Sequence, residues 1–410
     1  GWVMDRDKLH LYLLTAGHFL DHLTTLVFAT IAAVALSREW NMGYAELVAY
    51  ATPGFVAFAV FSWPAGWLAD RWSREGMMAV YFIGLGLASI LTGFAWSPIT
   101  ISASLFILGM FAAIYHPVGL ALLVQGRQRT GMLIAVNGVW GNFGVASAAL
   151  FAGWFIDHGR WRYAFYVPGL VSIALGIVYS IVMRREIMAR NAASKPQATA
   201  AVAAPPATPE MRAILLRLSA VIFFTAAFSS LIFQSTTFAL PKIFDERLSA
   251  IIGSATMLGW LTFLVFAIAS SAQLLTGLAL DRFSTRSVYL TSAVAQTLFF
   301  ALMPGLIGWP ALIVGLGFTF AAFGSIPIND FLIGRLAKSE LRAQIYGARY
   351  VLSFSVMSLS LPLIAWVHLN WGFDRLFQIL AVCAGAILIS VTLLPRQLPQ
   401  DGQKPALAGA

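Results

Sequence analysis

Ionisable side chains inside long apolar segments are the residues of this 410-residue chain best suited to chemistry. The first apolar segment, residues 9–36, contains His18, Asp21, His22 and Thr25. Their spacing of i, i+3, i+4 and i+7 places all four on one face of a helix. An ionisable group inside a membrane costs on the order of 3 kcal/mol, so each one needs a partner or a function. Histidine beside aspartate is suited to taking up and releasing protons.

The fourth apolar segment, residues 98–125, contains Tyr115-His116-Pro117. The proline kinks a helix and frees a backbone carbonyl, which leaves His116 as a polar tip at the bend. We predict that His116 switches Asp21 between charged and neutral states. The alternative is that Asp21 only hydrogen-bonds a neighbouring helix, Pro117 is only a kink and His116 is a core residue.

In the second half of the chain, Asp330 and Arg349 lie at similar depths of neighbouring apolar segments. One interpretation is that Arg349 holds an anionic group of a substrate and Asp330 releases it on protonation; the other is a structural ion pair. The predicted proton-coupling residues are Asp21, His22, His116 and Asp330. The predicted substrate-binding residues are His18, Thr25, Asn137, Asn142, Gln234, Asn329, Tyr346 and Arg349.

Other function classes leave different patterns. Asp21, His22, His116 and Asp330 are ligand types that suit first-row divalent ions, so a metal-ion transporter is the alternative to an organic-solute transporter. No G-x-S-x-G, H-E-x-x-H or phosphate-cradling glycine loop occurs, so we predict neither an enzyme nor an ATP-driven pump. A non-transporting receptor or scaffold is the third possibility. No cofactor and no resident metal are predicted.

The composition indicates whether the surface of this protein faces water or lipid. It is 59% hydrophobic and only 10% charged, with a mean hydropathy of +0.80. A soluble domain carries about a quarter charged residues, so a polytopic membrane protein in contact with lipid is predicted. The net charge of +9 comes from short loops between apolar runs, which argues against nucleic acid binding. The one cysteine, Cys383, lies in an apolar run and excludes a disulfide framework.

About 20 apolar residues cross the hydrocarbon core, and twelve such segments are predicted. Their limits are 9–36, 44–69, 76–95, 98–125, 130–156, 163–183, 214–240, 250–280, 287–306, 308–335, 342–367 and 373–394. Residues 184–213 are rich in Ala and Pro and read as a flexible cytoplasmic linker. The predicted domains are therefore a six-helix bundle at 1–183, the linker, a second bundle at 214–394 and a flexible tail at 395–410.

A short charged loop occurs twice, each time after an apolar segment. Gly66, the Asp70-Arg71 pair and Ser73 recur in register 211 residues later, at Gly277, Asp281-Arg282 and Ser284. This internal repeat indicates two homologous halves.

These two loops resemble those after the second and eighth helices of the major facilitator superfamily of secondary transporters. The resemblance implies an all-α membrane protein with twelve transmembrane helices in two pseudo-symmetric six-helix bundles. It also implies that Asp70 meets a base at the end of the fourth span, for which Arg127 is the candidate. On the family resemblance that these two loops carry, the predicted gating residues are Gly66, Asp70, Arg71, Arg74, Arg127, Asp281, Arg282 and Arg286. The His-x-x-Asp of the first span and the His-Pro of the fourth look like the fosmidomycin-resistance-type branch. In the fifth span Asn142 stands where the family's antiporter motif has a proline, so the motif does not establish export.

Basic residues indicate the orientation. With both termini in the cytoplasm, most arginines of the short loops lie inside, as the positive-inside rule requires. The resulting prediction is a monomeric, proton-coupled secondary active transporter of a small organic, anionic solute. It would work by alternating access across a bacterial inner membrane.

Overall fold

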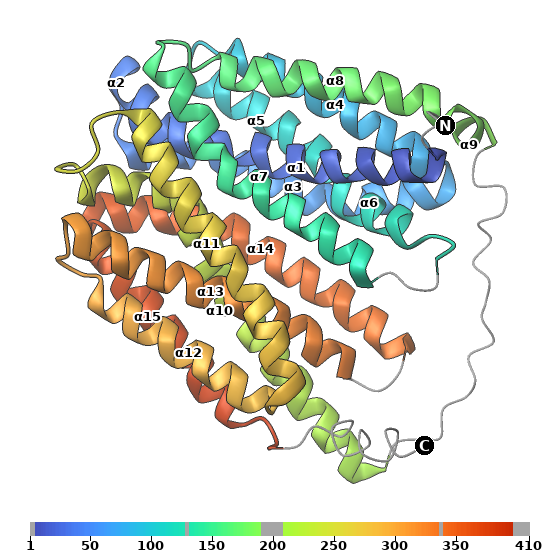
Figure 1. The fold of residues 1–410 in the computed structure, drawn as a ribbon, viewed down its shortest axis with the longest axis vertical. Coiled ribbons are helices and arrows are strands. Elements are labelled where there is room, and N and C mark those ends of the chain that lie inside the picture. Colours follow the sequence, from blue (N-terminus) through green and yellow to red (C-terminus); the bar gives the residue numbers. More distant parts are fainter. Residues whose placement is uncertain (1–4, 128–130, 190–207, 336–338, 397–410) are drawn as a thin grey trace. The chain divides into compact units, whose positions relative to one another are not determined.

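The computed structural model describes residues 5–127, 131–189, 208–335 and 339–396, except for the side chains of residues 131, 334–335 and 339–347. Every regular element in these residues is a helix (Figure 1). The elements are α1 (Arg6–Ile31), the π-helix η1 (Ala32–Leu36), α2 (Ser37–Glu39), α3 (Tyr44–Arg71), α4 (Arg74–Gly93), α5 (Pro98–Ala112), α6 (Tyr115–Val124), α7 (Gly131–Asp157), α8 (Tyr163–Val182), α9 (Arg184–Ala189), α10 (Pro209–Arg247), α11 (Ala255–Arg282), α12 (Thr285–Leu302), α13 (Gly308–Arg335), α14 (Ser339–Trp371) and α15 (Phe373–Thr392).

Within the described residues, eleven continuous helical stretches are long and apolar enough to cross a membrane. In this count α1, η1 and α2 form one stretch, and α5 and α6 form another. The predicted ninth span falls on α12, which is not among the eleven because Arg286, Gln296 and several serines and threonines lower its hydropathy. Each of the twelve predicted spans coincides with a helix or an interrupted helix.

Contacts between Cα atoms divide the chain into two compact units. The N-terminal unit contains the described residues up to Ala189 together with Phe238–Ala267, and the C-terminal unit contains the rest. The division runs through α10 and α11, so it differs from the predicted bundle limits at 183 and 214. Those limits remain a prediction. Within the predicted linker, α9 and the start of α10 are helical, and residues 190–207 lie outside the described residues.

The N-terminal unit is built from helix pairs: α1 packs on α7, α4 on α8 and α3 on α5 (Figure 1). Its core is aromatic, since Tyr81, Phe82 and Tyr179 are completely buried. In the C-terminal unit, α12 packs on α13 and α15. There the rings of Phe300 and Phe318 stack with centroids 4.6 Å apart.

The start of α11 belongs to the N-terminal unit because Asp157, the last residue of α7, caps it. The Asp157 carboxylate accepts hydrogen bonds from the backbone N–H groups of Ala255 (3.0 Å) and Thr256 (2.7 Å). These amides have no partner within the helix, and the helix dipole favours a negative charge there. Glycine allows the approach: a Cβ on Gly153 would lie 2.3 Å from the Ala255 carbonyl oxygen.

The repeated loop has equivalent helix ends and an equivalent N-cap in both copies. Helix α3 ends at Arg71 and α11 ends at Arg282, which are 211 residues apart. The next helices are capped by the serine of the motif: Ser73 Oγ accepts from the Gly76 N–H (2.9 Å), and Ser284 Oγ accepts from the Ser287 N–H (3.2 Å). The serine of each copy therefore acts as an N-cap, which stabilises the helix start.

Candidate functional site

A break in the fourth span exposes His116. Helix α5 ends at Ala112 and α6 begins at Tyr115, so two residues separate them. Pro117 lies in the first turn of α6, where its missing N–H is tolerated, but it cannot bond to the carbonyl four residues earlier. The predicted kink is therefore an interruption of the helix. His116 lies at this interruption and is 31% exposed.

Asp21 of α1 and His116 form the central pair of the site. Nδ1 of His116 lies 3.3 Å from Oδ2 of Asp21, and the aspartate side chain is 1% exposed. The distance is that of an ion pair, and the Asp21 Oδ1 and His116 Nδ1 atoms are both buried without a hydrogen-bond partner. A buried carboxylate in this state requires a proton or a charged partner. The pair brought together by sequence analysis is thus adjacent in space.

His18 and His22 extend this pair into a cluster. Nδ1 of His18 lies 2.9 Å from the Asn137 carbonyl oxygen, and its Nε2 lies 3.1 Å from Nε2 of His22. Because a carbonyl only accepts, Nδ1 of His18 carries the hydrogen. In the neutral form its Nε2 is therefore an acceptor, and His22 must donate from its own Nε2. Protonation of His18 would place its Nε2–H opposite the Nε2–H of His22, which is unfavourable. The protonation states of these two rings therefore depend on one another.

The three histidines also contact each other through their rings. The ring centroids of His18 and His116 lie 5.3 Å apart, and those of His22 and His116 lie 5.4 Å apart. One ring nitrogen from each histidine lies within 4.8 Å of the others. Imidazole nitrogens suit first-row divalent ions, so this cluster is the feature that favours the metal-ion alternative.

Helix α7 fits closely against this cluster. A Cβ on Gly141 would lie 2.4 Å from the His18 ring, and one on Gly144 would lie 2.4 Å from the Phe19 carbonyl oxygen. Gly141 and Gly144 therefore serve the packing of α7 on α1. Asn142, on the same helix, is half-buried. The Thr25 hydroxyl donates to the Asp21 carbonyl at 2.9 Å, so it faces the backbone of α1.

Two tyrosines that sequence analysis did not single out complete the N-terminal site. The Tyr115 hydroxyl accepts from Nδ2 of Asn137 (2.9 Å) and donates to the Leu14 carbonyl (2.7 Å). The Tyr81 hydroxyl donates to the Gly17 carbonyl (2.7 Å). Tyr115 precedes His116 directly, and its ring stacks on His18 with centroids 5.0 Å apart. Its only sequence signal was this adjacency.

A second polar site lies within the C-terminal unit, where a cavity of about 160 Å³ has room for roughly five waters. Its polar lining consists of Ser229, Ser230, Ser325, Asn329, Arg349 and Ser353. Phe233 and Met357 form part of an apolar wall. Oγ of Ser229 is buried without a hydrogen-bond partner. The cavity therefore combines one cation, one amide and several hydroxyls.

Arg349 and Asp330 form the ion pair at this cavity. Nη1 of Arg349 lies 2.5 Å from Oδ1 of Asp330, with side-chain exposures of 10% and 51%. The neighbouring Asn329 accepts from the Thr225 hydroxyl at 3.1 Å. Since Asp330 is half-exposed and Arg349 is buried, the cation can exchange its carboxylate partner without leaving the cavity.

The remaining predicted residues are more scattered. Gln234 is buried in α10, and its Nε2 has no hydrogen-bond partner. The side chain of Tyr346 lies outside the described residues. Arg127, the candidate partner of Asp70, instead pairs with Asp7 at 2.5 Å, whereas Asp70 pairs with Arg74 at 3.0 Å. The Asp70–Arg74 pair joins the end of α3 to the start of α4 and needs no ordering of a distant segment.

The other gating candidates surround these loops. Arg71 lies over the Trp67 ring, 4.1 Å from its centroid. A Cβ on Gly66 would only touch Pro117. In the second copy Asp281 and Arg282 are exposed, and Arg286 donates to the Thr392 carbonyl at 3.2 Å. The two copies therefore share their N-cap but differ in their charged contacts.

These features define a multi-pass helical membrane protein with ionisable groups buried in its spans. The chain belongs to the Major Facilitator Superfamily, whose family model matches residues 14–253 and 222–409. Its fold is shared with the inward-open xylose transporter XylE from E. coli, at a TM-score of 0.71, 15% identity and coverage of 98% of this chain and 100% of that one. The predicted fold class and family are thereby confirmed.

Two curated relatives are similar to parts of the chain. The niacin transporter NiaP of Acinetobacter baylyi is 28% identical over 171 residues, which are 41% of this chain and 38% of the relative. A gallate transporter of Pseudomonas putida is 23% identical over 145 residues, which are 35% of this chain and 32% of the relative. The chain thus aligns with well under half the length of these relatives.

Proposed function

We propose that this protein is a proton-coupled secondary active transporter of a small organic anion across a bacterial inner membrane, with both termini in the cytoplasm. The observation that carries the proposal is the buried Asp21 carboxylate beside His116, where Oδ1 of Asp21 and Nδ1 of His116 have no hydrogen-bond partner. Membership of a superfamily of secondary transporters supports it.

The proton step in this proposal is a change of partner for Asp21. With His116 protonated and Asp21 ionised, the two groups attract each other at 3.3 Å. When the proton leaves the pair, one buried negative charge remains and must be compensated, which favours a different conformation. Coupling follows only if the proton affinity of the pair differs between the two conformations. Since His116 is partly exposed, it is the entry point for the proton, and His18 and His22 adjust their hydrogen bonds in response.

The substrate step uses the second site. Arg349 binds a carboxylate, the serines and Asn329 bind further polar groups, and Asp330 competes for the guanidinium. Niacin and gallate, which the two relatives are named for, are both small aromatic rings with a carboxylate. We therefore propose a small aromatic or cyclic monocarboxylate as substrate.

The experiment that tests this function measures proton movement on substrate addition. Purified protein in proteoliposomes, with a pH dye inside and no metal ions present, is given nicotinate, gallate, benzoate or an uncharged amide control. A carboxylate that is carried should change the internal pH, and the amide should not. His116→Ala should shift the pH at which this flux is greatest. Flux of a carboxylate without proton movement would refute coupling.

A second candidate function is transport of a divalent metal ion, which the grouping of His18, His22 and His116 favours. Calorimetric titration with Zn²⁺ or Co²⁺, with Asp21→Ala as the comparison, separates the two functions. Metal uptake into metal-free liposomes, together with the absence of carboxylate flux, would replace the organic-anion proposal.

A further inference from the structure

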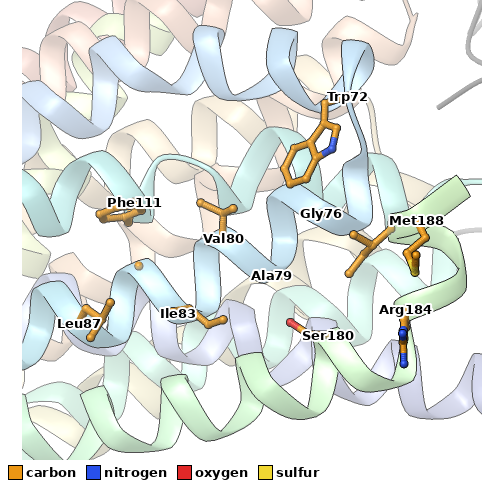
Figure 2. Close-up of a pocket in the computed structure, with 12 residues that line it drawn as sticks. Trp72, Gly76, Ala79, Val80, Ile83, Leu87, Phe111, Ser180, Arg184 and Met188 are labelled. Atoms are coloured by element: carbon orange, nitrogen blue, oxygen red, sulfur yellow. The ribbon is translucent and has the colours of Figure 1, made fainter. Parts of the chain in front are cut away.

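An apolar pocket of about 530 Å³ that the proposed function does not use lies beside α4 in the N-terminal unit. Its floor is one face of α4, formed by Gly76, Val80, Ile83 and Leu87, which recur every three or four residues. Figure 2 shows Trp72, Met188 and Arg184 near one end of this pocket and Leu87 and Phe111 near the other.

Two glycines create the depth of this pocket. A Cβ on Gly76 would lie 2.6 Å from the Trp72 ring, and one on Gly84 would lie 2.2 Å from the Phe111 ring. These rings can therefore lie directly against the backbone of α4. At the surface, Val80, Leu87 and Met188 remain 37%, 58% and 70% exposed, respectively. Val80 and Leu87 belong to the membrane-spanning helix α4, where exposed side chains face lipid, so the pocket opens to acyl chains.

The length of the pocket matches one leaflet. From Gly76 to Leu87 is eleven residues, or about 16 Å at a rise of 1.5 Å per residue. The hydrocarbon core of a bilayer is about 30 Å thick, so the pocket spans about half of it. Trp72 lies at the terminus of the helices, the level at which tryptophan is enriched in membrane proteins.

Arg184 supplies a cation at the Trp72 end of the pocket. Arg184, the first residue of α9, lines the pocket and is exposed. Among the described residues no carboxylate forms an ion pair with it, whereas the nearby Arg74 pairs with Asp70 and Glu186 pairs with Arg6. Basic residues at the ends of transmembrane helices bind anionic lipid headgroups. We propose that this pocket binds one acyl chain of an anionic phospholipid, with the phosphate held by Arg184.

The test measures lipid retention by native mass spectrometry of the full-length protein in detergent. Phosphatidylglycerol and phosphatidylcholine with identical chains are added at equal concentration. One cation near a membrane surface corresponds to about a fivefold preference for the anionic lipid. Arg184→Gln should remove that preference, and the matched Arg185→Gln, which changes an exposed arginine that does not line the pocket, should keep it.

A second pair of variants tests the acyl-chain part. Val80→Trp should fill the pocket and prevent retention of either lipid, whereas Leu91→Trp changes an exposed residue of α4 outside the pocket and should retain phosphatidylglycerol. Thermal stability of each variant without lipid reports folding; if Val80→Trp is unfolded, the arginine pair decides. Equal effects of Arg184→Gln and Arg185→Gln would overturn the proposal, as would stabilisation by soluble glycerol phosphate equal to that by phosphatidylglycerol.

Discussion

Removing the Asp330 carboxylate should make the protein bind an anionic substrate more tightly. In the structure, Oδ1 of Asp330 lies 2.5 Å from Nη1 of Arg349. The Asp330 carboxylate and the substrate carboxylate would therefore compete for this one guanidinium. An exposed ion pair is worth about 0.2–1 kcal/mol, and loss of one partner of a fully buried pair costs about 3–5 kcal/mol. Because Arg349 is 10% and Asp330 51% exposed, we expect an intermediate value of about 1–2 kcal/mol. The Kd of Asp330→Asn should then be about 5–30 times lower than that of the wild type.

The assay is calorimetric titration of purified protein at neutral pH with the carboxylate that the proteoliposome experiment identifies as the substrate. Asp374→Asn is a matched control, since this carboxylate of the same unit accepts from the Gly305 N–H at 3.0 Å. Its Kd should be unchanged, and Arg349→Gln should weaken binding at least as strongly as Asp330→Asn strengthens it. Weaker binding by Asp330→Asn would mean that Asp330 holds Arg349 in position and does not compete with the substrate.

Three further predictions concern the fold around the sites. Ser73→Ala should lower the free energy of unfolding by about 1 kcal/mol because α4 loses its N-cap; an unchanged denaturant midpoint would contradict this. Gly141→Ala should lower the free energy of unfolding by about 1–3 kcal/mol because the added methyl overpacks the His18 ring. Gly138→Ala should be neutral or slightly stabilising in the same unfolding experiment, since nothing lies within 4 Å of its added Cβ. In a Cys383→Ser background, Ser287→Cys should react with an impermeant thiol reagent only from the cytoplasmic side, and periplasmic labelling would refute the orientation.

Much of the fold was predictable because a bilayer imposes strong rules on sequence. Span length and hydropathy located the eleven helical stretches of the described residues that are long and apolar enough to cross a membrane, and the repeat at Asp70-Arg71 and Asp281-Arg282 located two equivalent helix ends. The break before Tyr115 was predictable only as a kink, since Pro117 specifies a lost hydrogen bond but not the number of residues that leave the helix. The role of Ser73 as an N-cap depends on a local backbone angle that the repeat alone does not specify.

The sites were predictable only in part. His18, Asp21 and His22 share a helix face, so their proximity follows from helical periodicity, and His116 was found because an ionisable residue in a span is conspicuous. The partners of Arg127 and His18 were not predictable. Arg127 pairs with Asp7, which is 120 residues away, and His18 bonds to the backbone of Asn137. Such contacts depend on how helices pack side by side, which local sequence does not encode.

The most direct measurement of the central claim compares accumulation with exchange for Asp21→Asn. In proteoliposomes the wild type should accumulate a labelled carboxylate when a pH gradient is the only driving force, and it should exchange that carboxylate at equal concentrations. Asp21→Asn should lose accumulation and keep exchange, because an amide cannot carry the proton beside His116. Asp245→Asn, which changes a carboxylate paired with Lys242, is the matched control; it should both accumulate and exchange the labelled carboxylate. Gradient-driven accumulation by Asp21→Asn at the wild-type level would contradict the account.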